Sequence, residues 1–390
     1  MKNFTYKHTI AACLIGYISQ AIIVNLAPLL FLTFAKEFGL QLFEITLLTT
    51  LNFLMQLLTD LFASKYAEKI GYRKCLVAAH LLCAVGLIGM AFLPSVLPSL
   101  AGLLISVCLY AIGGGLLEVL VSPTIEGCPT QNKTGMMSIL HSFYCWGVVL
   151  TVLLSTLFFV AFGTESWRAL TCLWSVVPLL NALFFTQVPM YEMHTGNEEK
   201  GHYKTLFKQK IFWVLVLLMI CAGSCELAVA QWASALTEEG LGVSKTMGDL
   251  LGVCGFAVMM GISRSLYGKF CEKLPLKPTM AICAVLCALG YLLIAFSPIA
   301  LVGFIGCMVC GFAVGIFWPG TFSLATRNVK NGGTTMFALL ALSGDLGCCL
   351  GPTLVGFTSG EGLQTGILFA LVFPAVLLFA LLWLKKEKTE

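Results

Sequence analysis

The residues best suited to chemistry in this chain are three acidic side chains within long apolar stretches: Glu118, Glu226 and Asp345. An ionised carboxylate inside a bilayer costs at least about 2.5 kcal/mol, so such a group is usually paired, protonated or exposed to a water-filled cavity. No lysine or arginine is expected at the same depth, because Arg264 falls near the cytoplasmic end of its apolar stretch. We therefore predict that some of these acids are protonated at neutral pH and that they bind and release protons.

Glu118 has the most informative surroundings of the three acids. It follows the glycines Gly113–Gly115 and precedes Pro123 within one apolar run. Consecutive glycines let a neighbouring helix approach closely, and a proline removes one backbone hydrogen bond and can kink a helix. This combination predicts a span that moves and responds to protons. The alternative is structural: Glu118 pairs with a fixed base, or Glu226 and Asp345 are neutral donors to backbone carbonyls.

Amide and aromatic side chains within the apolar runs are candidates for binding a polar solute. An amide both donates and accepts hydrogen bonds, which matches a sugar hydroxyl, and an indole ring suits the apolar face of a pyranose. The candidates are Gln20, Asn25, Asn52, Gln56, Gln231, Trp146, Trp232, Trp318 and His141. Each tryptophan can instead pack in the core or anchor the chain at the membrane surface. His141 can titrate near about pH 6.5 or simply pack.

The composition identifies the class of protein in which these residues act. Hydrophobic residues make up 58% of the chain and charged residues 11%, whereas a soluble domain carries about 25% charged residues. We therefore predict an integral membrane protein that binds no nucleic acid. The 17 cysteines lie mostly in apolar runs, where cysteine acts as a small apolar residue. The sequence has no zinc-type spacing, no nucleophile–base constellation and no phosphate-binding loop, so we predict no metal, no cofactor and no enzyme activity.

Twelve apolar stretches are long enough to cross a bilayer, which takes about 20 helical residues. They cover residues 9–34, 41–64, 76–93, 99–125, 135–161, 167–188, 211–236, 246–268, 279–296, 299–325, 334–358 and 363–384. With the N-terminus inside, 19 of the 23 lysines and arginines fall in inner segments and three in outer segments. This bias predicts that both termini are cytoplasmic, in a multi-pass protein of the cell (inner) membrane. The predicted fold class is an all-α membrane protein.

One long polar segment separates the first six apolar stretches from the last six. It predicts an N-terminal six-helix bundle over 1–188, a cytoplasmic linker over 189–210 and a C-terminal six-helix bundle over 211–390. A short repeat supports the division, because residues 64–73 and 268–277 match in the order small, Lys, aromatic, small, Glu, Lys, aliphatic. Two pseudo-symmetric six-helix halves around a central site are the layout of a rocking transporter.

A polar stripe on the second apolar stretch contains Asn52, Gln56 and Asp60, which are four residues apart and share one helix face. At the offset of the repeat, Asp60 corresponds to Arg264. We predict that these two charges are gates at the cytoplasmic ends of equivalent helices, while Asn52 and Gln56 face the substrate pathway. Structural pairing of both charges with the basic loops is the alternative.

The loop after the second stretch resembles the signature of the major facilitator superfamily, in which a glycine, an acid, a glycine and basic residues follow the second helix. This chain has Ser64 at the first glycine position and Glu68 at the acid position. The resemblance implies the major facilitator fold, with twelve transmembrane helices in two six-helix bundles. It also adds Glu68 and Arg73 to the predicted gating charges.

Further patches resemble the fucose–proton symporter-like branch of that superfamily. They are residues 113–123, residues 141–147 with His141 and Tyr144, residues 223–232 with Glu226 and Trp232, and residues 317–325 with Trp318. The branch implies a sugar carried with a proton, with Glu118 taking part in the coupling, and Tyr144 joins the candidate solute ligands. The fucose carrier of this branch has a second acid in its first span, where this chain has Asn25. Asn25 is then a neutral sugar ligand, or coupling is arranged differently, or there is none.

These features together predict a secondary active transporter that moves a small polar solute, best matched by a sugar, through proton symport with alternating access. One alternative is a proton-antiport exporter of drugs or metabolites. Another, from a different class, is a membrane receptor or scaffold that transports nothing. The expected partners are a small-molecule solute, protons and the lipid bilayer, and the expected state is a monomer.

Overall fold

The computed structural model describes residues 4–130, 133–191, 203–270, 275–329, 333–360 and 362–384. The regular elements in these ranges are helices. Twelve segments among them are long and apolar enough to cross a membrane, from Tyr6–Phe38 to Leu363–Trp383. The twelve predicted spans and the all-α fold class are therefore confirmed.

The chain divides into two compact units, Met1–Gly196 and Asn197–Glu390. The division falls within the polar segment 189–210, of which residues 192–202 lie outside the described part of the structure. Six of the membrane-spanning segments belong to the first unit and six to the second.

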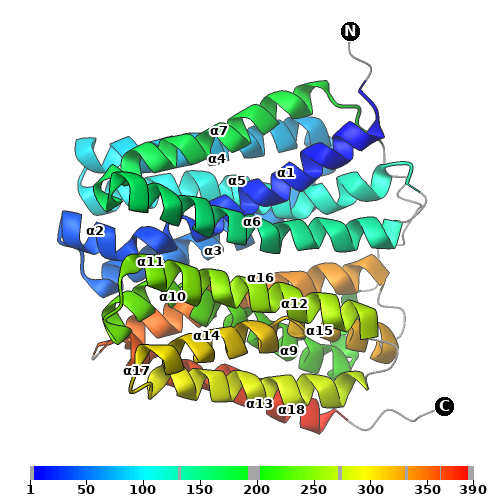
Figure 1. The fold of residues 1–390 in the computed structure, drawn as a ribbon. Helices are drawn as coiled ribbons and strands as arrows, with labels where there is room; N and C mark the ends of the chain where they lie inside the picture. The colour runs from blue at the N-terminus through cyan, green and yellow to red at the C-terminus, as the bar shows by residue number, and fades with distance from the viewer. Residues whose placement is uncertain are drawn as a thin grey trace. The chain divides into compact units, whose positions relative to one another are not determined.

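The first unit consists of long helices that run side by side (Figure 1). Its elements are α1 (Tyr6–Asn25), η1 (Pro28–Leu30), α2 (Phe31–Phe38), α3 (Leu42–Ile70), α4 (Tyr72–Val96), α5 (Ser99–Gly127), α6 (Lys133–Phe162), η2 (Thr164–Ser166) and α7 (Trp167–Gln187). Helix α5 packs against α4, α3, α1 and α6. It is therefore the helix on which the unit is assembled.

The second unit has more interruptions in its helices. Its elements are α8 (Tyr203–Lys208), α9 (Lys210–Ala230), α10 (Ala233–Ala235), η3 (Leu236–Gly240), α11 (Lys245–Met247), η4 (Gly248–Cys254), α12 (Gly255–Phe270), α13 (Leu276–Ala295), α14 (Ala300–Val314), α15 (Phe317–Asn328), α16 (Gly333–Thr358), α17 (Leu363–Ala370) and α18 (Val372–Trp383). Helix α9 packs against α16, α18 and α15, so it holds this unit together as α5 holds the first.

Some spans that the sequence predicts as single helices are broken in the structure. The first span is divided into α1, the short 3₁₀ turn η1 and α2, and η1 begins at Pro28. The tenth span is divided between α14 and α15, and Pro319 lies in the first turn of α15. A proline has no backbone N–H and cannot continue the hydrogen-bond ladder behind it. Discontinuous helices are where secondary transporters place their binding sites. Pro123, in contrast, lies inside α5, which continues to Gly127.

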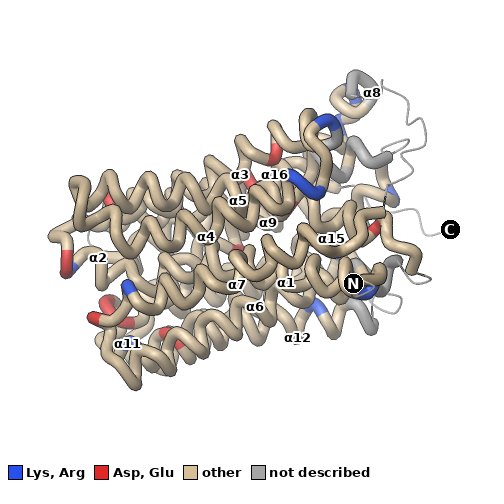
Figure 2. The backbone as a smooth tube through the Cα atoms, turned by 90° about the horizontal axis from the view of Figure 1, so that it is seen from above, with Lys and Arg blue, Asp and Glu red and all other residues tan. Residues whose placement is uncertain are grey.

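Charged residues stand mainly towards the ends of the helices, and the stretches between them are almost free of charge in the drawn tube (Figure 2). This distribution is the one expected of helices whose middle parts lie in hydrocarbon, where a charged side chain is costly. The few charges within the spans therefore need a specific explanation.

Close helix pairs in each unit depend on glycine. A Cβ atom on Gly86 of α4 would lie 2.6 Å from the backbone N of Tyr110 on α5. In the second unit, a Cβ on Gly223 of α9 would overlap the carbonyl oxygen of Gly344, and a Cβ on Gly347 would overlap that of Ile220. Small residues let the backbones of membrane helices approach and gain dispersion contacts. The α4–α5 and α9–α16 pairs use this device.

Candidate functional site

The glycines Gly113–Gly115 let three different helices reach α5. A Cβ on the first would lie 2.5 Å from the carbonyl oxygen of Ala79 on α4. On the second it would lie 2.6 Å from Cδ1 of Ile23 on α1, and on the third 2.9 Å from Oδ1 of Asp60 on α3. The predicted close approach is therefore confirmed. Successive helical residues point about 100° apart, so three adjacent glycines serve three neighbours.

Glu118 is joined to α1 and α3 by a short chain of hydrogen bonds. The side-chain Nε2 of Gln20 donates to Oε2 of Glu118 at 3.2 Å and to Oε1 of Gln56 at 3.0 Å. Gln20 and Gln56 are 6% and 4% exposed. Three candidates from three helices thus meet in one polar cluster, which we call the amide–acid cluster: the buried Gln20 and Gln56 and the half-buried Glu118.

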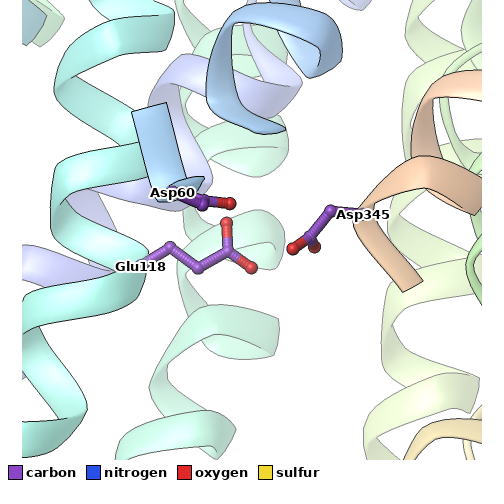
Figure 3. A group of neighbouring side chains, drawn as sticks. All are labelled: Asp60, Glu118 and Asp345. Carbon is purple, nitrogen blue, oxygen red and sulfur yellow. The ribbon is translucent and has the colours of Figure 1, made fainter. Parts of the chain in front are cut away.

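A second carboxylate approaches this cluster from α3. Figure 3 shows the side chains of Asp60 and Glu118 pointing toward one another, and carboxylate oxygens of the two residues lie within 4.8 Å of each other. Two ionised carboxylates at this separation repel by about 3 kcal/mol at an effective dielectric constant of about 20. A proton on either one relieves the repulsion. Asp60 therefore lies beside a predicted proton site, and its predicted gating role stays a prediction.

Several polar atoms around the amide–acid cluster have no hydrogen-bond partner among the described residues. They are Oε1 of Gln20, Nε2 of Gln56, Oδ1 of Asn52 and Oγ1 of Thr49. A buried polar atom without a partner costs about 1–3 kcal/mol, so such atoms indicate a place where something else binds. The set contains both donors and acceptors.

Thr49 was missed by the sequence analysis, although a signal for it exists. It lies three residues before Asn52, so it continues the stripe of Asn52, Gln56 and Asp60 towards the start of α3. Residues three or four apart share a helix face. A single threonine in an apolar run is typical of an ordinary helix residue. Only its spacing from Asn52, Gln56 and Asp60 indicates that Thr49 belongs to the polar stripe.

Glu226 in the second unit has a basic partner, contrary to the sequence prediction. Nη2 of Arg264 on α12 lies 3.2 Å from Oε2 of Glu226 on α9, and these side chains are 26% and 9% exposed. The prediction was wrong because it judged the depth of Arg264 from its position along the chain. The long arginine side chain carries its charge well away from its own Cα, to another depth in the membrane.

Breaking the Arg264–Glu226 pair is expected to destabilise the second unit. Arg264→Gln leaves the Glu226 carboxylate without this counter-charge, and removing one partner of a buried pair costs about 3–5 kcal/mol. The partial exposure of Arg264 favours the lower end of that range. The melting temperature of the purified protein in detergent measures the effect.

The double variant Arg264→Gln/Glu226→Gln serves as the control, because two amides can bond to each other without charge. It should recover much of the lost stability. A single variant that melts as the wild type does would contradict a structural role for the pair.

The three tryptophan candidates differ in their surroundings. Trp232 is fully buried, and its Nε1 donates to the carbonyl oxygen of Pro352 at 2.9 Å. Trp318 packs against α16, where a Cβ on Gly344 would overlap its ring. Trp146 is 61% exposed. For Trp232 these contacts favour the packing alternative, while the exposed ring of Trp146 suits a lipid-facing anchor.

The remaining solute candidates have the following positions. Asn25, the last residue of α1, donates from Nδ2 to the carbonyl oxygen of Ala21 at 2.9 Å. The ring of His141 on α6 lies edge-on to Tyr17 of α1, with 5.5 Å between ring centres. Tyr144 is half-buried on α6, and Gln231 is buried at the end of α9. Their roles in solute binding stay predictions.

The remaining charged candidates are Arg73, Glu68 and Asp345. Nη1 of Arg73 donates to the carbonyl oxygens of Phe185 and Thr186, near the end of α7. A cation at a helix C-terminus is favourable there. The side chain of Glu68 lies outside the described part of the structure. Asp345, also labelled in Figure 3, is half-buried on α16 of the second unit.

A buried histidine was also missed by the sequence analysis. His80 on α4 is completely buried, with Nδ1 2.7 Å from the carbonyl oxygen of Leu76. Its Nε2 lies 2.7 Å from Nδ2 of Asn181, which also donates to the carbonyl oxygen of Ala12. The carbonyl requires the proton on Nδ1, so Nε2 accepts. These hydrogen bonds connect α4 and α7 to α1. No residue spacing in the sequence predicts them, because the residues lie on different helices.

Another buried charge lies where the second unit has its π-helical turns η3 and η4. Asp249 is fully buried, accepts from the hydroxyl of Ser234 at 2.5 Å and pairs with Lys245 at 3.1 Å. Burial raises the pKa of the nearby Glu238, with Lys245 acting in the opposite direction and Asp249 adding to the increase. Extra residues in π-helical turns often mark functional positions. Here the π-helical turn η4 contains one member of a charge pair, Asp249.

The chain matches the family model of the Major Facilitator Superfamily over residues 10–352 and 256–390. It is similar to a solved D-xylose–proton symporter, with a TM-score of 0.79 and 16% identity over 97% of this chain and 96% of that chain.

Two further solved structures are similar over nearly their whole length. A mutant of the nucleoside transporter NupG gives a TM-score of 0.75 at 13% identity over 97% of this chain and 100% of that chain. The transporter FucP in the outward conformation gives 0.67 at 17% identity over 98% and 99%. No curated protein matches the chain. Likeness at these identities shows a shared fold.

Proposed function

This chain is a transporter of the major facilitator superfamily, and we propose that it moves a small polar solute, best matched by a sugar, by proton symport with alternating access. The superfamily and the major facilitator fold that the sequence resemblance implied are confirmed by the family match. The substrate class and the coupling ion are the new parts of the proposal. The amide–acid cluster in the first unit is the observation that carries them.

The substrate class follows from the polar atoms left over in that cluster. Oε1 of Gln20 and Oδ1 of Asn52 are acceptors, Nε2 of Gln56 is a donor, and the hydroxyl of Thr49 is both. A solute that satisfies this set must donate and accept hydrogen bonds at several points, because Thr49, Asn52 and Gln56 lie along about two turns of α3. A polyhydroxylated molecule does so without a net charge. A similar solved structure is a D-xylose–proton symporter, which agrees with this choice.

The coupling ion follows from the carboxylates beside those amides. Glu118 accepts from Gln20 and lies within 4.8 Å of Asp60. A proton that joins this pair changes both its charge and its hydrogen bonding at the point where the solute binds. Binding of one ligand is then linked to binding of the other. We further propose that the protein is a monomer of the cell (inner) membrane with both termini cytoplasmic, as the lysine and arginine bias predicts.

The test is solute-driven proton movement in vesicles that contain the purified protein and a trapped pH indicator. We would add D-xylose, L-fucose, D-glucose, a nucleoside or an amphiphilic drug outside, with equal pH on both sides. Symport predicts that the interior acidifies as one of the sugars enters. Interior alkalinisation with a drug or metabolite would support the proton-antiport exporter instead. Sugar entry without a pH change, or entry that requires Na⁺, would contradict proton coupling.

Asn52→Ala is expected to weaken the binding of the transported sugar by about 1–3 kcal/mol, or roughly 5–150-fold, because a solute hydroxyl loses its acceptor. Thermal stabilisation of the protein by that sugar reports the affinity. Gln187→Ala is the matched control, since Gln187 is exposed at the end of α7. Equal affinities in the two variants would remove Asn52 from the site.

A further inference from the structure

The hydrogen bonds of the amide–acid cluster have a fixed order of donors and acceptors in the structure. Gln20 uses both hydrogens of its Nε2, one on Oε2 of Glu118 and one on Oε1 of Gln56. Its own oxygen and the Nε2 of Gln56 are buried without a partner in the described part of the chain. This arrangement requires a Glu118 oxygen that accepts, as an ionised carboxylate does. An ionised Glu118 can only accept and so favours this direction, whereas a protonated Glu118 also has a hydroxyl that needs an acceptor.

A protonated Glu118 fits the opposite direction. Its hydroxyl must donate, and Oε1 of Gln20 is a buried acceptor that has no partner among the described residues. The nitrogen and oxygen of an amide occupy equivalent places, so a half-turn of the group exchanges them. If Gln20 turns alone, its oxygen faces the oxygen of Gln56, which is repulsive. If both amides turn, Gln56 donates to Gln20 and every bond in the chain is remade in reverse.

We propose that Glu118, Gln20 and Gln56 form a reversible hydrogen-bond relay, in which a proton on Glu118 reverses both amides and changes the polar atom that Gln56 presents to the solute. With Glu118 ionised, Gln56 presents its N–H donor. With Glu118 protonated, it presents its oxygen as an acceptor for a solute hydroxyl. The inference rests on the proposed symport, and it makes Gln20 a positioning residue that carries the state of the acid to the solute.

The surroundings of the relay leave room for this motion. A Cβ on Gly114 would lie 3.3 Å from Oε1 of Gln20 and 3.4 Å from Cδ of Gln56. A contact of 3.3 Å is tighter than nine in ten real Cβ contacts, so the missing Cβ leaves space for the Gln20 amide to rotate, whereas 3.4 Å to Gln56 is ordinary contact. Gly114 therefore has a second role beside helix packing.

The titratable groups on the helices packed against α5 define the electrostatic setting. Asp60 on α3 faces Glu118 and, when ionised, favours a proton there. Tyr17 on α1 is hydrogen-bonded with Ser122 at 3.2 Å, and His141 on α6 lies against the Tyr17 ring. His80 on α4 is occupied by its own hydrogen bonds. Among these groups, Asp60 is the one whose carboxylate oxygens lie within 4.8 Å of those of Glu118, so its charge acts directly on the relay.

The relay gives the coupling a physical form. A solute hydroxyl that donates to Gln56 favours the reversed direction and hence a proton on Glu118. By thermodynamic reciprocity, a proton on Glu118 raises the affinity for that solute by the same factor. The two ligands need not touch each other, because the two amides stand between them.

The test follows the side-chain carbonyls of glutamine, labelled with ¹³C at Cδ, by infrared difference spectroscopy of the protein in vesicles between about pH 4 and about pH 9, a range that brackets buried carboxyl groups. The Gln56 band is identified by its absence from Gln56→Met. In the wild type this band should shift with the same midpoint as the carboxyl band of Glu118. In Gln20→Met the Gln56 band should no longer shift, although Glu118 still titrates.

Three further variants complete the test. Glu118→Gln should abolish the shift, and Gln187→Met should leave it unchanged because that side chain is exposed away from the cluster. Gly114→Ala keeps every polar group and should reduce the shift by crowding the Gln20 oxygen. Its melting temperature reports separately the contact of the added Cβ with the Ile23 side chain. A Gln56 band that stays fixed in the wild type, or still shifts in Gln20→Met, would overturn the relay, as would a Glu118 that never titrates.

The spectra require no transported solute, so the two proposals fail separately. Vesicles that move no proton with any sugar would refute the symport while the spectra still support the relay. Sugar-driven proton entry with fixed glutamine bands would refute the relay and leave the symport standing.

Discussion

Replacing Glu118 by glutamine is expected to reduce solute accumulation driven by a pH gradient to the background of protein-free vesicles. The amide keeps the size of the side chain and resembles the protonated acid, but it cannot release a proton. Exchange of solute between two equilibrated sides should continue, because it needs no proton release. Uptake of radiolabelled sugar, measured with and without a pH gradient, separates the two activities.

The matched control is Glu126→Gln, which removes an exposed carboxylate from the same helix. It should accumulate solute as the wild type does. If Glu118→Gln still accumulates solute against a gradient, the coupling acid is another residue, with Asp60, Glu226 and Asp345 as candidates. A wild-type protein that only equilibrates solute would identify a uniporter, and the missing acid in the first span would then be explained.

Gly347→Ala is expected to cause a large loss of stability in the second unit. The added Cβ would overlap the carbonyl oxygen of Ile220, which belongs to the backbone of α9 and cannot rotate away. Overpacking typically costs about 1–3 kcal/mol, and more where the backbone must move. The melting temperature and the yield of the purified protein should both fall.

Gly261→Ala is the control, because a Cβ at that position of α12 meets no atom within 4 Å. Both changes replace a helical glycine by alanine, which by itself favours the helix by about 1 kcal/mol. The difference between the variants therefore measures the α9–α16 contact. Equal melting temperatures would show that these helices pack more loosely than the structure indicates.

The sequence by itself determined the number of spans and the fold class. Each span depends on the summed apolar character of about 20 consecutive residues, and that sum needs no knowledge of neighbours. The resemblance in the loop after the second span indicated the superfamily, because this signature is also a run of consecutive residues that can be recognised without the neighbouring helices. Glu118 and the glycines before it were also visible, because an acid and three adjacent glycines are conspicuous in an apolar run.

The partners of these residues were decided by the tertiary structure. Gln20 and Glu118 are 98 positions apart, and Glu226 and Arg264 are 38 apart. No helical period relates residues on different helices. The glycines set how closely two backbones approach, and the reach of an arginine sets where its charge lies. These quantities placed Arg264 beside Glu226 and Asp60 beside Glu118. The sequence alone had predicted only that Asp60 and Arg264 are gating charges at the cytoplasmic ends of their helices.

The helix breaks and the tryptophans also show which features the sequence predicts and which the tertiary structure decides. Pro28 marks a possible interruption in the sequence, but Pro123 does so equally, and only the first ends its helix. Trp232 and Trp146 have the same side chain in similar apolar runs, yet one is fully buried and the other 61% exposed. Whether a helix continues or a ring is buried depends on which neighbours complete its hydrogen bonds and contacts, and that is a property of the packed bundle.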